Sequence, residues 1–137
     1  MKTFLSSYAA ALVILLFLDA IWLSIMGKNF YRPQLGSLMA QEFNWVAAIL
    51  FYLIYALGLT GLVLYPLLQA TGCPMKSLWM GALFGLSAYA TYDLTNLATL
   101  KNWPLLVVIV DLAWGTILTG ASSFATFILI KHILKLA

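Results

Sequence analysis

The sequence predicts an all-α, membrane-spanning four-helix bundle that forms a single domain over residues 1–137. Three observations lead to this prediction. Hydrophobic residues make up 64% of the chain and charged residues only 8%, whereas a soluble domain carries about 25% charged residues. A chain of this length has too little interior to hide so much apolar surface from water. Four separate stretches also have the length of a membrane helix, which is about 20 mostly apolar residues.

The four predicted spans cover residues 4–26, 45–69, 77–100 and 104–130. The first span is long, and no small-residue cleavage site follows it, so we predict a retained helix and not a cleaved signal peptide. The second span carries no charge at all. Asp19, Asp93 and Asp111 are the only charged residues in the first, third and fourth spans.

Short connections separate the spans, apart from one long loop predicted at residues 27–44 with room for a surface helix. The turn at 70–76 contains Gly and Pro, and the turn at 101–104 ends in a proline that suits the first position of a helix. Trp45, Trp79 and Trp103 stand where spans begin, which is typical of the aromatic belts at membrane interfaces.

The orientation follows from the lysine and arginine residues that flank the spans. With a cytoplasmic N-terminus, the inner flanks carry Lys2, Lys76, Lys131 and Lys135. The outer flanks then carry Lys28, Arg32 and Lys101. This excess favours both termini in the cytoplasm. The single cysteine, Cys73, excludes a disulfide within the chain, and the scattered basic residues form no patch for nucleic acid.

Three of the four acidic residues fall at one depth in the predicted bundle. Asp19, Asp93 and Asp111 each lie seven residues from the outer end of their span. At 1.5 Å per residue, this places each carboxyl group about 10 Å below the outer surface. A charged side chain at a helix centre costs about 2.5–3.5 kcal/mol on insertion scales. We therefore expect these aspartates to face inward and to find partners.

The helical periodicity supports inward-facing aspartates, because small and polar residues share their faces. In the third span, this face carries Gly81, Gly85, Tyr89, Asp93 and Asn96. In the fourth span, it carries Asp111, Gly115, Thr119, Ser122 and Thr126.

The motif D-x-x-W occurs at Asp19–Trp22 and again at Asp111–Trp114. Because the first and fourth spans run in opposite directions, we expect the two indoles to bracket the aspartate layer from above and below. The predicted pocket consists of Asp19, Asp93, Asp111, Asn96, Tyr52, Tyr55, Tyr89, Trp22 and Trp114.

Three carboxyl groups so close together cannot all ionise unaided, so we expect at least one to keep its proton near neutral pH. The pocket would bind or pass a proton, a cation or a polar lipid headgroup. If it holds a metal, the oxygen ligands of Asp19, Asp93 and Asp111 suit a divalent cation such as Mg²⁺. The sequence contains no zinc-binding cluster and no phosphate-binding loop.

Two other functions remain open. The protein would be an intramembrane enzyme acting on a lipid or isoprenoid if one aspartate is a general acid or base, or if the three hold a metal. Alternatively, the aspartates only join helices in a structural or assembly protein, each bond contributing about 0.6 kcal/mol. Four helices are few for a transport path, so transport would imply a homo-oligomer.

The segments LDAIWL at 18–23, YDLTNLATL at 92–100 and VDLAWG at 110–115 resemble DUF2177, a family of small bacterial integral membrane proteins. The resemblance covers nearly the whole chain, including the spacing of the spans. It implies location in the bacterial inner membrane, in contact with membrane lipids. It implies no activity and assigns no functional residue.

Overall fold

The computed structural model describes all residues from 1 to 137 and contains helices and turns without any β-strand, which confirms the all-α prediction. The helical residues form four continuous stretches. Non-helical residues at 39–44, 70–73 and 100–104 separate these stretches.

The first stretch comprises α1 (Lys2–Met26), a π turn (Gly27–Tyr31), α2 (Arg32–Leu35) and a final 3₁₀ turn (Gly36–Leu38). The sequence predicted a loop from residue 27, but the chain stays helical for twelve further residues. Gly27 keeps helical backbone angles, and Pro33 falls in the first turn of α2, where its missing N–H is tolerated. α2 itself ends before Gly36, whose φ of +46° favours glycine.

The second stretch comprises α3 (Trp45–Leu59), a π turn (Thr60–Leu64) and α4 (Tyr65–Gln69). The side chain of Asn44 starts α3 by accepting a 3.0 Å hydrogen bond from the backbone N–H of Ala47. Again a π turn comes just before a proline, Pro66. Such widened turns are rare and occur mostly as single-turn bulges inside α-helices.

The last two stretches are α5 (Pro74–Thr99) and α6 (Leu105–Ile128), the latter followed by a π turn (Leu129–Ile133). α5 begins three residues before the predicted span because Pro74 occupies the first turn, where proline fits well. Pro104 caps α6 from outside instead of forming its first residue.

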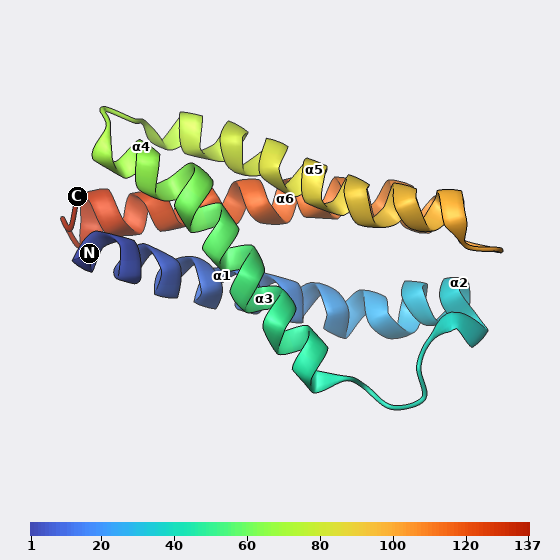
Figure 1. Ribbon diagram of the computed structural model, residues 1–137. Helices are drawn as coiled ribbons and strands as arrows, with labels where there is room; N and C mark the ends of the chain where they lie inside the picture. The colour runs from blue at the N-terminus through green and yellow to red at the C-terminus, as the bar shows by residue number, and fades with distance from the viewer.

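The helices α1, α5 and α6 lie alongside one another, and α3 crosses them obliquely before α4 leads back to the end that holds both termini (Figure 1). The Thr3 hydroxyl donates a 2.7 Å hydrogen bond to the carbonyl oxygen of Leu136, which joins the first and last turns of the chain. α2 and the turn between α5 and α6 lie at the opposite end (Figure 1).

Small residues hold α5 close to α6. A Cβ atom added to Gly81 would lie 2.4 Å from Cβ of Ser123, and one added to Gly85 would lie 2.1 Å from the carbonyl oxygen of Gly115. Close approach of this kind is the usual role of small residues between membrane helices. The face predicted from Gly81 to Asp93 is therefore a packed helix interface.

The outer surface of the molecule is mostly apolar. Large hydrophobic side chains such as Phe17, Ile54 and Ile117 are more than half exposed. Three helical stretches are long and apolar enough to cross a membrane: Lys2–Leu38, Trp45–Gln69 and Leu105–Ile133. α5, with 26 residues, is one residue longer than Trp45–Gln69 but more polar, and it is not among the three.

Candidate functional site

All three membrane aspartates are buried. Asp19 on α1 is 6% exposed, Asp93 on α5 is 0% exposed and Asp111 on α6 is 7% exposed. Each of them therefore faces the interior of the protein, as we expected from the cost of placing a carboxyl group in lipid. Their surroundings differ, and these differences define the site.

The carboxylate of Asp19 accepts two hydrogen bonds from other helices. Trp114 Nε1 on α6 donates a 2.9 Å bond to Asp19 Oδ1. The Tyr52 hydroxyl on α3 donates to Asp19 Oδ2. Asp19 thereby connects α1 with both α3 and α6, and both of its donors are uncharged.

The carboxylate of Asp111 accepts a hydrogen bond from the π turn that follows α1. The Tyr31 hydroxyl donates a 2.5 Å hydrogen bond to Asp111 Oδ1. Trp22 Nε1 in turn donates a 3.1 Å bond to the Tyr31 hydroxyl oxygen. Tyr31 can reach Asp111 because the helical path continues through residues 27–31 instead of leaving the bundle as a loop.

The two D-x-x-W motifs exchange partners across the α1–α6 interface. Trp114 binds Asp19 directly, and Trp22 reaches Asp111 through Tyr31. The two indoles stack on each other, with ring centroids 4.3 Å apart and planes inclined by 4°. The expectation that they bracket the aspartates from above and below is therefore wrong, because both rings turn inward to meet.

A cavity of about 410 Å³ opens beside these residues, and we call it the acidic cavity. Its lining consists of Asp19, Trp22, Leu23, Gly27, Tyr31, Leu35, Met39, Phe43, Tyr89, Tyr92, Asp111 and Trp114. Two carboxyl groups from different helices thus share one space with five tyrosine or tryptophan rings. This volume lies within the usual range for small-molecule sites.

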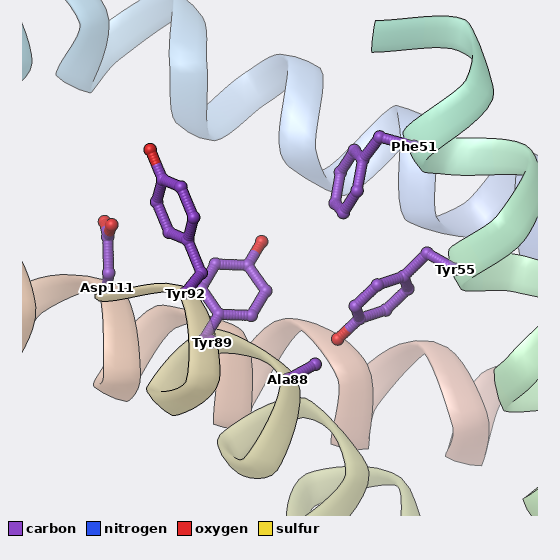
Figure 2. A pocket seen from close by; sticks show the side chains of 6 residues that line it. All are labelled: Phe51, Tyr55, Ala88, Tyr89, Tyr92 and Asp111. Carbon is purple, nitrogen blue, oxygen red and sulfur yellow. The ribbon is translucent and has the colours of Figure 1, made fainter. Parts of the chain in front are cut away.

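A second cavity of about 380 Å³ adjoins the first and shares Tyr89, Tyr92 and Asp111 with it; we call it the aromatic cavity. Its remaining walls are Phe51, Tyr55 and Ala88. Phe51 and Tyr55 extend from α3 toward Tyr89 and Tyr92 on α5 (Figure 2). The Tyr55 hydroxyl lies 2.7 Å from the Thr119 hydroxyl, which fixes this ring against α6.

The absence of a side chain at Gly115 determines where the Tyr89 ring lies. A Cβ atom at Gly115 would be 2.3 Å from two carbons of that ring. The ring therefore rests against the backbone of α6, from where it forms a wall of both cavities.

Asp93 does not line either cavity, so the predicted pocket of three aspartates contains only two of them. Both Asp93 oxygens are buried without a hydrogen-bond partner. Asn96, one turn further along α5, also lines neither cavity. Asp93 instead continues the series Gly81, Gly85 and Tyr89 on α5, whose members pack against α6.

The other predicted residues divide between the two cavities. Asp19, Trp22, Tyr89, Asp111 and Trp114 line the acidic cavity, and Tyr55 lines the aromatic cavity. Tyr52 contributes through its hydrogen bond to Asp19. No group of three His, Cys, Asp or Glu side chains has an arrangement that could hold a metal ion.

Sequence reasoning missed Tyr31 and Tyr92. Tyr31 lay in a predicted loop, although the run of aromatic and basic residues around it, NFYRP at 29–33, indicated a membrane interface. Tyr92 lies three residues after Tyr89 on α5. The predicted face continues from Tyr89 to Asp93, four residues on, and therefore does not include Tyr92. Tyr31 and Tyr92 both line the acidic cavity.

No positive side chain neutralises the carboxyl groups inside the protein. None of the seven lysine and arginine residues is among the buried residues. The most enclosed of them, Lys131, donates to the Gly72 carbonyl oxygen at 3.1 Å, near the termini. The hydrogen bonds to Asp19 and Asp111 come only from phenols and indoles.

Comparison with known proteins identifies a family but no activity. A family model described as "Predicted membrane protein (DUF2177)" matches residues 4–128. No curated protein and no solved structure matches the chain.

Proposed function

The chain belongs to the DUF2177 family of predicted membrane proteins, and from this premise we propose that it binds an organic cation of the ammonium class in the acidic cavity. One observation supports this function above all. Two buried carboxyl groups, Asp19 and Asp111, meet in the acidic cavity, which is lined by tyrosine and tryptophan rings and contains no positive side chain.

The charge balance of the cavity favours a cationic occupant. A buried carboxylate is stable only when it is paired or well hydrogen-bonded. Neutral donors hold Asp19 and Asp111 in position but leave their negative charge uncompensated. A positive ligand would supply the missing charge and would gain from the low dielectric constant of the site.

The aromatic lining favours an organic cation over a metal ion. An ammonium group over the face of a tyrosine or tryptophan gains about 0.5–2 kcal/mol, depending on its desolvation. Tyr31, Tyr89 and Tyr92 surround the carboxyl groups with such rings. A divalent metal, by contrast, would need several oxygen ligands at short distances, and no suitable group of three acidic side chains is present.

We place the protein in the bacterial inner membrane as a bundle with four crossings, with both termini in the cytoplasm and lipid around its apolar surface. α5 would form the fourth crossing despite its polarity. The hydroxyls of Thr91 and Thr99 bond to carbonyl oxygens of their own helix at 2.7 and 2.8 Å, which lowers the cost of placing them in lipid. If the cation is transported, a homo-oligomer would complete the path.

Binding can be measured with radiolabelled tetraethylammonium and the purified protein in lipid nanodiscs. We expect saturable binding that Asp19→Asn and Asp111→Asn each weaken by about tenfold or more, because each removes a charge from a desolvated site. Glu42→Gln is the matched control, because Glu42 is the one exposed acidic residue and lines neither cavity.

Equal losses in all three variants would show only a general effect of net charge and would contradict the proposal. Absence of saturable binding to the wild-type protein would contradict it as well. Recovery of a chemically altered lipid after incubation would instead favour the intramembrane enzyme.

A further inference from the structure

We infer that Asp93 and Asp111 together hold one proton, which the protein releases when a cation enters the acidic cavity. The proton site stands on the geometry of α5 and α6 alone. Its coupling to a cation rests on the proposed function.

The register between α5 and α6 brings the two carboxyl groups face to face. Gly81 meets Ser123, Gly85 meets Thr119, and Tyr89 meets Gly115. Each step of four residues forward on α5 corresponds to four residues backward on α6. The next step pairs Asp93 with Asp111, so their juxtaposition belongs to the same regular interface.

The environment of Asp93 favours the protonated form. Its side chain is 0% exposed, and neither oxygen has a hydrogen-bond partner. An ionised carboxylate in such a place would lose its solvation by water without compensation, and such groups usually become neutral instead. None of the contacts of Asp93 would stabilise a negative charge on its buried carboxyl group.

The groups around Asp93 include no positive charge. Asp111 on α6 and Trp103 in the turn before α6 are the groups beside the Asp93 carboxyl, and Tyr92 precedes it on α5. The Trp103 Nε1 atom is also buried without a partner. Asp111 Oδ1 is occupied by Tyr31, which leaves Oδ2 as the oxygen that can accept from a protonated Asp93.

Asp111 links the proton to the cation because it belongs to both sites. A cation beside Asp111 supplies the positive charge that the shared proton supplied before. The O–H bond at Asp93 then breaks, the proton leaves to water, and the electron pair stays on the carboxylate. Proton and cation therefore bind in competition, and each weakens the other by the same factor.

The proton itself can be detected by infrared spectroscopy of the protein in lipid vesicles without any added cation. We expect the C=O stretching band of a protonated carboxyl group near neutral pH. Asp93→Asn should lack this band, whereas Asp19→Asn and the exposed control Glu42→Gln should keep it. A band that persists in Asp93→Asn would overturn the inference.

A second measurement covers the case in which Asp93→Asn does not fold. Wild-type protein is labelled with ¹³C at the side-chain carboxyl carbon of aspartate. The label must shift the C=O band if the band comes from an aspartate. A band from Glu42, the only other acidic side chain, would not shift. A band that does not shift, or no band at all, would overturn the inference without any variant.

The coupling is tested by measuring tetraethylammonium binding at several pH values. The wild-type affinity should rise with pH, by up to about tenfold per pH unit if one proton is released. Asp93→Asn should bind with little dependence on pH, and an unchanged dependence would contradict the coupling. An Asp93-dependent infrared band in a protein that binds no tetraethylammonium would refute the proposed function and leave the proton site standing.

Discussion

The indole of Trp22 stacks on the indole of Trp114, and each ring leads by hydrogen bonds to the aspartate that precedes the other. The two residues come from opposite ends of the sequence and from antiparallel helices. A motif of four residues, used twice, therefore joins α1 to α6 and places both carboxyl groups at one cavity. We expect this cluster to act as a single unit in stability as well as in binding.

The first prediction concerns that stacked pair. Trp22→Ala and Trp114→Ala should be non-additive, with a coupling of about 1 kcal/mol in the free energy of unfolding, as for other aromatic pairs in contact. The measurement is a double-mutant cycle of reversible unfolding in mixed micelles. Trp79→Ala is the control, because Trp79 is 67% exposed. Additive losses would mean that the stacking contributes nothing.

The second prediction concerns the contact between α5 and α6. Gly85→Ala should destabilise the protein by about 1–3 kcal/mol, because the new methyl group meets the Gly115 carbonyl oxygen and the Thr119 side chain. Gly61→Ala has open space around its new Cβ and should be neutral or stabilising by up to about 1 kcal/mol. Both values follow from the same unfolding assay, and equal effects would refute the tight interface.

The third prediction concerns the wall formed by Tyr89. Gly115→Ala should push the Tyr89 ring away from α6 and into the cavities, because the new Cβ would overlap the ring. Tetraethylammonium binding should weaken by about tenfold, equivalent to about 1.4 kcal/mol. Gly61→Ala again serves as the control. Unchanged binding in a folded Gly115→Ala protein would show that this wall does not shape the ligand site.

The fourth prediction concerns the orientation in the membrane, for which the chain supplies its own probe. Cys73 is the only cysteine and is exposed in the turn between α4 and α5. In intact bacterial cells, a membrane-impermeant maleimide should label Cys73 only after the inner membrane is permeabilised.

The complementary variant places the single cysteine at the opposite end of the bundle. Cys73→Ser combined with Ser37→Cys moves it to an exposed position after α2, where the maleimide should react once it has access to the periplasm. The reverse labelling pattern would place both termini outside.

The sequence was most informative where a helix face is regular. The pattern from Gly81 through Gly85 to Tyr89 identified the side of α5 that packs on α6, because small residues in a membrane helix have few other roles. The same periodicity predicted that Asp93 and Asp111 face inward, and both are buried.

The sequence was less informative where the structure depends on the direction of a side chain or on a helix that continues beyond its predicted end. Neither proline in the chain's first two helical stretches ends its helix, because a π turn precedes each one and accommodates it. Tyr31 was therefore missed. The separation of Asp93 from the cavities follows from helix rotation and packing, which a depth estimate along the chain does not include.

The hydrogen bond between Thr3 and Leu136 makes the polypeptide almost a closed ring. Joining the two ends there and reopening the chain within residues 39–44 would leave every helix uncut, because those residues are non-helical. Such a circular permutant would begin with α3 and end with the 3₁₀ turn after α2. If the cavities still form from the same helices in this different order of synthesis, their assembly depends on which faces meet and not on which helix is made first.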